Sequence, residues 1–267
     1  MSTKKIGEVI LDVQNISLGF GGVKALTDIS FNVREHEVRA IIGPNGAGKS
    51  SMLNCINGVY APQQGSIAFR GQTFKHMNSR QVAEMGVART FQNLALFKGM
   101  SVLDNIMTGR NLKMKSGLLS QAFRNPFGWG SAEKEEIAQR EFVEQIIDFL
   151  EIQAHRKTPV GQLPYGLQKR VDLGRALAME PQVLLLDEPT ASLDPTAKRE
   201  VERLMDEFAA SGMTLVFSSH NLGQVKRLAS RVIYLEQGAM LADLPVHDFF
   251  NGTLPAAAAH FLKGELA

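Results

Sequence analysis

The chain has 267 residues, of which 44% are hydrophobic and 21% charged, and its formal net charge is +2. This length supports one large domain or two small ones, and the small net charge argues against a protein that coats nucleic acid, which normally needs a strong basic excess. The single cysteine, Cys55, cannot form an intramolecular disulfide, which fits a reducing compartment, and no apolar run approaches the ~20 residues that span a bilayer.

The first third of the chain predicts antiparallel strands followed by a strand, a loop and a helix. EVILDVQNISLGF and LTDISFNV are rich in Val, Ile and Phe, and GFGGVKA forms the turn between them. EVRAIIG is a short apolar run that suits a buried strand, and KSSMLNCIN has helical spacing. GSIAFRG, SRQVAEMG and VARTF then predict a strand, a helix and a strand.

From about residue 98 to 180 the pattern becomes helical, in SVLDNIMTGR, AEKEEIAQREFVEQIIDFLEI and QKRVDLGRALAME. In the second of these, Ile137, Phe142, Ile146 and Phe149 fall roughly on one face, which predicts an amphipathic helix. Residues 111–132 contain Gly, Ser, Pro and the only Trp, and they predict an exposed connection or a segment that faces a membrane or a permease.

After residue 181 strands and helices alternate again. VLLLD, TLVFSS and RVIYLEQG read as strands, whereas TAKREVERLMDEFAAS and LGQVKRLA read as helices. Apolar strands that alternate with helices predict a parallel sheet covered on both faces. The sequence therefore predicts an α/β core that is interrupted by a helical insert.

The segment GPNGAGKS, which follows a predicted strand and opens a predicted helix, matches the phosphate-binding pattern G-x-x-x-x-G-K-[ST]. Glycine lets the backbone wrap closely around phosphate oxygens, and the loop amides and the helix N-terminus supply partial positive charge. Lys49 is expected to reach the β- and γ-phosphates, and the Ser50 hydroxyl to bind Mg²⁺. The predicted nucleotide-binding residues here are Gly43, Pro44, Asn45, Gly46, Ala47, Gly48, Lys49, Ser50 and Ser51.

Two adjacent carboxylates end the apolar strand VLLLDE. Because burying charge is costly, adjacent acids at the end of a buried strand call for a function. Asp187 is expected to hold Mg²⁺ directly or through water, and Glu188 to polarise the attacking water as a general base.

Five motifs give the chain a family resemblance: GPNGAGKS, Gln92 in RTFQN, LPYGLQKR, LLLDEPTASLD and His220 in SSHN. They occur in the order of ATP-binding-cassette (ABC) ATPases, and the resemblance extends from about Val9 to Gly238. It implies an ATPase with ATP and Mg²⁺ as cofactors and a P-loop α/β fold with a RecA-like core, an antiparallel β subdomain and a helical subdomain. The cassette would span residues 8–245, with the helical subdomain at about 95–180 and a helical tail at 246–267.

The resemblance also assigns roles to single residues. Phe20 matches the aromatic residue that stacks on adenine. Gln92 matches the residue that contacts Mg²⁺ and the attacking water and links to the membrane partner, and His220 matches the one that contacts the γ-phosphate. Two cassettes would face each other head to tail, as a homodimer or with a sister ATPase, and residues 192–194 would cross that interface.

The signature segment that would close over the partner's ATP departs from the usual Leu-Ser-Gly-Gly-Gln, because Pro164, Tyr165 and Leu167 replace three of its residues. Proline has neither hydroxyl nor amide donor. Tyr165 and Gly166 remain as the predicted contacts, together with the N-terminus of a helix expected to start near Gln168. Lys169 and Arg170 would add positive charge or face solvent.

Within the family, LPYGLQKR, RTFQNLALF and the long insert resemble the ATPases of branched-chain amino-acid importers over roughly residues 1–187. From about Glu188, TASLDP, FSSHNLGQVKRLASRVIYLEQG and the tail DFFNGTLPAAAAHFLKGEL resemble the ATPases of tungstate-type oxyanion importers. The chain would then be a mosaic, natural or constructed, or an unusual natural lineage.

These resemblances imply a peripheral subunit on the cytoplasmic face of a bacterial inner membrane. It would drive two transmembrane permease subunits, a periplasmic protein would deliver branched-chain amino acids or related amides, and nucleic acid would not be a partner. The alternatives are an oxyanion importer, a cassette ATPase that acts in DNA repair or on the ribosome, and a binding module without turnover. The single cassette argues against the second, and Glu188 with His220 argues against the third.

Overall fold

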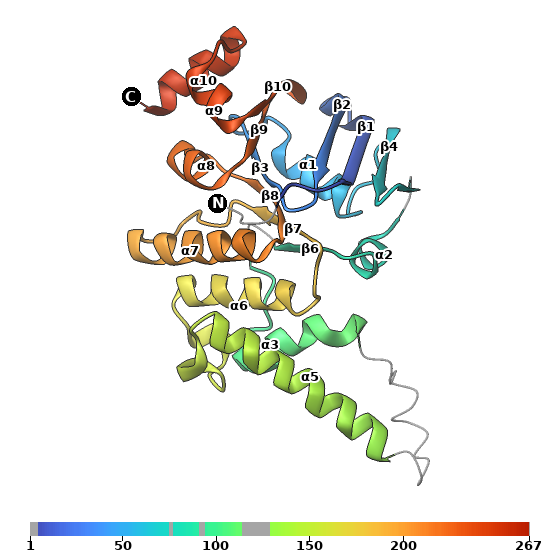
Figure 1. The fold of residues 1–267 in the computed structure, drawn as a ribbon, viewed down its shortest axis with the longest axis vertical. Coiled ribbons are helices and arrows are strands. Elements are labelled where there is room, and N and C mark those ends of the chain that lie inside the picture. Colours follow the sequence, from blue (N-terminus) through green and yellow to red (C-terminus); the bar gives the residue numbers. More distant parts are fainter. Residues whose placement is uncertain (1–4, 75–76, 91–93, 114–128, 267) are drawn as a thin grey trace. The chain divides into compact units, whose positions relative to one another are not determined.

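The computed structural model describes residues 5–74, 77–90, 94–113 and 129–266, and the chain divides into two compact units (Figure 1). The first unit comprises Met1–Gln92 and Gln182–Ala267, and the second comprises Asn93–Pro181. Across these described ranges, no helix combines the length and the apolar character that crossing a bilayer requires.

A four-stranded antiparallel sheet in the first unit has the order β2-β1-β4-β5. Its strands are β1 (Val9–Phe20), β2 (Val23–Arg34), β4 (Gln64–Phe69) and β5 (Gln72–Phe74). The first two are joined by only Gly21 and Gly22, both with positive φ, as a tight hairpin requires. The antiparallel pairing that the sequence predicted is therefore confirmed.

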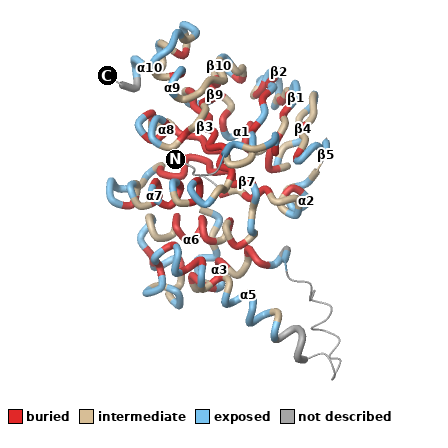
Figure 2. Tube along the Cα trace, in the orientation of Figure 1, coloured by how far each residue is buried: buried red, intermediate tan, exposed pale blue. Residues whose placement is uncertain are grey.

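The six-stranded sheet of the same unit has the order β10-β9-β3-β8-β7-β6. Its strands are β3 (Val38–Ile42), β6 (Val87–Thr90), β7 (Val183–Asp187), β8 (Thr214–Ser218), β9 (Arg231–Glu236) and β10 (Ala239–Pro245). All pairs are parallel except β9 with β10, and every residue of β3, β7 and β8 is buried (Figure 2). Because carboxyl ends of parallel strands meet at one edge, the loops after β3, β7 and β8 converge there.

The helices of the first unit follow the signals in the sequence. They are α1 (Lys49–Ile56), α2 (Ser79–Glu84), α7 (Pro195–Ser211), α8 (Leu222–Leu228), α9 (Val246–Asn251) and α10 (Ala256–Leu266). In α7, the side chain of Asp194 accepts hydrogen bonds from the amides of Thr196 and Ala197 at 2.9 and 3.1 Å, and Gly212 ends the helix at φ 93°. This capping also fixes the loop of residues 192–194.

The second unit is helical, with α3 (Val102–Met107), a 3₁₀ turn (Thr108–Leu112), α5 (Trp129–Phe149) and α6 (Tyr165–Leu177). The predicted apolar face of α5 is partly wrong, because Ile137 and Phe149 are 51% and 43% exposed. Ile146 of the predicted face is buried, together with Val143, Ile147 and Leu150, and these four follow the i, i+3, i+4, i+7 spacing. Most of the predicted connection at 111–132 lies outside the described residues.

Lys169 and Arg170 do not face solvent, because both residues are buried within the second unit. The Lys169 ammonium lies 5.8 Å from the centre of the Tyr165 ring, and Arg170 Nη1 donates to the carbonyl of Leu150 at 3.2 Å. Both cations therefore support the structure around α6.

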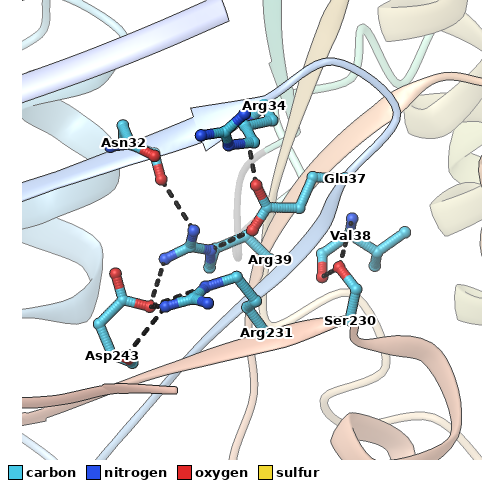
Figure 3. Close-up of polar contacts among 8 residues, drawn as sticks. All are labelled: Asn32, Arg34, Glu37, Val38, Arg39, Ser230, Arg231 and Asp243. Carbon is cyan, nitrogen blue, oxygen red and sulfur yellow. Dashed lines mark hydrogen bonds and ion pairs between the residues drawn. The ribbon is translucent and has the colours of Figure 1, made fainter. Parts of the chain in front are cut away.

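A buried ion network ties the two sheets of the first unit together (Figure 3). Arg39, 1% exposed, donates from Nε to Glu37 Oε1 at 2.6 Å, from Nη1 to Asp243 Oδ1 at 2.7 Å and from Nη2 to the Asn32 carbonyl at 2.8 Å. Arg231 Nη2 donates to the same Asp243 oxygen at 2.9 Å. Two acids thus balance two arginines, and the contacts join β2 to β3, β9 and β10.

Candidate functional site

The loop between β3 and α1 needs glycine at two positions. At Gly43, with φ 145°, a Cβ atom would lie 2.0 Å from the Leu235 carbonyl oxygen, and at Gly48, with φ 104°, it would lie 2.6 Å from that of Ala25. Both contacts are closer than any side-chain carbon tolerates, and both backbone conformations favour glycine. The glycines of the motif therefore hold residues 43–51, the phosphate loop, against β2 and β9.

The phosphate loop lines a cavity of about 270 Å³ in the first unit. The other walls come from the start of β2, from the residue after β7 and from the loop after β8. The lining residues are Val23, Lys24, Ala25, Asn45, Gly46, Ala47, Gly48, Lys49, Ser50, Ser51, Glu188 and His220. The structure thus brings most of the residues predicted from three separate motifs to one cavity.

Lys49 is one of two lysines that line this cavity. It is 7% exposed, and its ammonium donates to the carbonyls of Gly43 at 2.8 Å and Pro44 at 3.1 Å and to His220 Nε2 at 3.1 Å. The same His220 nitrogen also lies 3.1 Å from Glu188 Oε1, so the histidine ring stands between the lysine and the carboxylate. Lys49 is therefore held beside the loop, where phosphate oxygens could replace these acceptors.

Asp187, the last residue of β7, accepts three contacts while its side chain is 3% exposed. Its Oδ1 accepts from Ser50 Oγ at 3.2 Å and from Ser218 Oγ at 2.7 Å, and its Oδ2 pairs with Arg89 Nη2 at 2.8 Å. Sequence reasoning missed Arg89 and Ser218. The available signal was a polar residue near the end of each predicted strand, Arg89 in VART and Ser218 in TLVFS.

Ser50 and Asp187 offer hydroxyl and carboxylate oxygens, which are the donors that Mg²⁺ prefers. Within the described ranges, no group of three or more His, Cys, Asp or Glu side chains could hold a metal ion unaided. A site with one or two protein ligands fits Mg²⁺, which keeps several waters and is commonly completed by phosphate oxygens.

Glu188 has an unusual backbone, with φ 48° in the left-handed region. It is one of nine residues other than glycine with a positive φ in the described part of the chain, a conformation that costs free energy outside glycine. Its amide donates to Ser218 Oγ at 3.0 Å, which helps to hold the turn. The turn places the carboxylate on the cavity wall.

Glu188 is 9% exposed, so its carboxylate is largely desolvated. Its Oε1 lies 3.1 Å from His220 Nε2, and it makes no aligned hydrogen bond in the part of the chain that the structure describes. Burial raises the pKa of Glu188, while His220 and Lys49 oppose this shift and Asp187 adds to it. A carboxylate with a raised pKa on a cavity wall is suited to accept a proton from water.

Phe20 lies beside this site and not in its lining. The ring is at the end of β1, is 47% exposed, and packs edge-on against Tyr60 with 5.1 Å between ring centres. An exposed aromatic ring that a neighbour holds in place can offer a face for stacking.

Two of the predicted site residues lie in the second unit, and a third falls outside the described residues. Gln92 is outside the described residues, whereas Tyr165 and Gly166 are in the second unit, in the first turn of α6. That helix begins at Tyr165 and not near Gln168, whose amide donates the first helical bond to the Pro164 carbonyl at 3.1 Å. The amides of residues 165–167 consequently have no acceptor within their own helix.

Comparison with known proteins places the chain among transport ATP-binding proteins. A family model described as "ABC transporter" matches residues 26–191. The branched-chain amino acid transport ATP-binding protein LivG of Salmonella typhimurium is 32% identical over 239 residues, which cover 89% of this chain and 92% of LivG. The L-arabinose transport ATP-binding protein AraG of Geobacillus stearothermophilus is 35% identical over 246 residues. These residues cover 91% of this chain and 45% of AraG.

Among solved structures, a nucleotide-free ATP-binding cassette from an ABC transporter superposes with a TM-score of 0.80 at 28% identity. The likeness covers 95% of this chain and 98% of the cassette, so the predicted fold class is confirmed.

Proposed function

The chain belongs to the ABC transporter family, and we propose that this ABC-type ATPase hydrolyses ATP in the cavity at the phosphate loop to energise transport through a separate permease. One observation carries the proposal: Lys49, Glu188 and His220 line a single cavity, with Asp187 bonded to Ser50 at its edge. A phosphate-binding cation, a pair of metal-ligating oxygens and a general base are the parts that phosphoryl transfer to water needs.

Each residue of the site has a separate role in ATP hydrolysis. Lys49 and the amides of the phosphate loop bind and orient the phosphates, and Ser50 with Asp187 would hold Mg²⁺, whose charge would offset that of the phosphates. Glu188 accepts the proton of the attacking water. His220 exchanges its contact with Lys49 for the γ-phosphate, and Gln92 contacts the water.

Two cassettes close head to tail, as a homodimer or with a sister ATPase. Tyr165 and Gly166 of one cassette then face the ATP bound by the other, and the first amides of α6, which have no acceptor within that helix, support this role. A side-chain hydroxyl lost at Pro164 costs roughly 1.5–3 kcal/mol if it had bonded a charged phosphate, or about one to two decades of affinity. The signature is weakened and remains usable.

The ATPase acts on the cytoplasmic face of a bacterial inner membrane, with two permease subunits and a periplasmic binding protein. Its substrates are branched-chain amino acids or related amides, which the motifs before Glu188 and the named activity of LivG support. AraG, a relative of similar sequence identity, is named for arabinose, so the preference for amino acids rests on the motifs before Glu188. The tungstate-type residues after Glu188 support a mosaic chain and an oxyanion as the second candidate.

Co-purification from source membranes tests the substrate. We expect the tagged chain to retain a permease pair whose ATP hydrolysis, in vesicles with its binding protein, rises severalfold with leucine and stays unchanged with molybdate, tungstate or arabinose. The Lys49→Ala variant serves as the control that lacks the phosphate-binding cation. Stimulation by an oxyanion and not by amino acids would overturn the assignment.

A further inference from the structure

A buried arginine lies behind the proposed metal site. Arg89 belongs to β6, opposite Leu185 of β7, and its side chain is 3% exposed. Nη2 donates to Asp187 Oδ2 at 2.8 Å, and Nη1 donates to Asn54 Oδ1 on α1. One guanidinium therefore joins the helix that follows the phosphate loop to the strand that carries the metal-facing carboxylate.

The two oxygens of Asp187 have different partners. Oδ2 is held by Arg89, whereas Oδ1 accepts from Ser50 and Ser218. A guanidinium stays charged in proteins, so Arg89 places a positive charge 2.8 Å from Asp187 Oδ2. The negative charge of this buried carboxylate is thus balanced by protein alone.

We propose that Arg89 is a positioning residue that holds the Asp187 carboxylate against Ser50 before nucleotide binds and limits how tightly that carboxylate binds Mg²⁺. The inference rests on the proposed function, because it concerns the metal site assigned to Ser50 and Asp187. Arg89 gives the site a fixed geometry before metal binds, and it makes Mg²⁺ binding depend more on the phosphates of ATP.

Two effects of Arg89 on Mg²⁺ binding oppose each other. A carboxylate that is already held in one rotamer binds metal better, because it loses no rotational freedom on binding. This gain in binding free energy is at most the rotational entropy of one side chain. A guanidinium beside the same carboxylate repels the metal, and Coulomb energy doubles for a divalent cation and grows in a partly desolvated site. We expect repulsion to dominate, so removing the charge should strengthen Mg²⁺ binding.

The experiment measures how strongly Mg²⁺ and nucleotide support each other. The dissociation constant of a fluorescent, non-hydrolysable ATP analogue is measured in EDTA and in excess Mg²⁺, and the ratio of the two values reports the contribution of the metal. Arg89→Gln removes the charge and keeps an amide donor, and Arg89→Lys keeps the charge. Asn54→Ala is the matched control that removes the second contact of Arg89 without changing charge.

We expect the ratio to rise about tenfold in Arg89→Gln, equivalent to ~1.4 kcal/mol, and to change little in Arg89→Lys and Asn54→Ala. A purely structural brace would lower the melting temperature of all three variants and leave the ratio unchanged, which would overturn the inference. A rise shared by Arg89→Lys would overturn it as well. If Arg89→Gln does not fold, Arg89→Met tests the same expectation.

A separate variant distinguishes failure of this inference from failure of the proposed function. In Asp187→Asn, the ratio of the two dissociation constants is expected to fall from its wild-type value to close to one. If the wild-type ratio is already near one, the proposed metal site is wrong, and the inference is overturned with it. If Asp187→Asn abolishes the metal effect while Arg89→Gln leaves it unchanged, only the role of Arg89 is refuted.

Discussion

Glu188→Gln is expected to slow ATP hydrolysis by a factor of about 10²–10⁴, the usual contribution of a general base, while ATP binding is retained. The amide of glutamine fills the same space beside His220 but cannot accept the proton of the attacking water. Lys49 and the phosphate loop, which bind the phosphates, are unchanged by the substitution. Phosphate release and calorimetric binding, measured on the same preparation, separate the two effects.

Glu84→Gln provides a matched control, because Glu84 is an exposed residue of α2 that pairs with the exposed Arg80, away from the cavity. It should retain the wild-type rate. Because burial raises the pKa of Glu188, the carboxylate becomes protonated at a higher pH than usual. The wild-type rate should therefore begin to fall, as pH decreases, above the pKa of an ordinary Glu. A Glu188→Gln variant that keeps most of its activity would contradict the assignment.

Arg39→Met is expected to lower the free energy of unfolding by about 3–5 kcal/mol, because breaking a buried ion pair leaves a charge without compensation. Glu37 is 1% exposed and would lose its 2.6 Å contact with Arg39, and Asp243 would lose one of its two arginines. Methionine fills similar length without charge. Urea denaturation monitored by circular dichroism measures the change.

The matched control is Arg80→Met, which breaks a surface i,i+4 pair with Glu84 where the arginine side chain is 77% exposed. A pair of that kind contributes about 0.2–1 kcal/mol. Equal losses in the two variants would mean that the network shown in Figure 3 does not hold the two sheets together. The double variant Arg39→Met/Glu37→Gln should recover part of the stability, because it removes the unpaired acid as well.

Local patterns predicted the fold well where one residue type determines the backbone. The glycines at 43 and 48 fixed the phosphate loop because no other residue fits their φ angles, and apolar runs identified β3, β7 and β8. Prediction was weaker in the second unit. Exposed Ile137 and Phe149 show that a single apolar residue does not reveal which helical face is packed. Helix α6 begins directly after Pro164, three residues before the predicted start, and proline there leaves no amide donor to be satisfied.

The site was predictable as a set of motifs, but its contacts were not. Arg89 and Asp187 are 98 residues apart in sequence, and Lys49 meets His220 across 171 residues, so only the parallel order of β6, β7, β8 and β3 brings them together. The left-handed backbone of Glu188 also had no signal, since the turn is imposed by the Ser218 contact and the neighbouring strand.

Light scattering of purified Glu188→Gln protein, with and without MgATP, tests most directly whether this chain works as a closing ATP-driven cassette. Without hydrolysis, bound ATP should trap the dimer in which the first turn of α6 faces the partner's phosphate loop. We expect a monomer without nucleotide and a dimer with MgATP, and this dimer should disappear when Lys49 is also replaced by Ala. A monomer that binds MgATP and never dimerises would contradict closure through the Pro164–Leu167 signature.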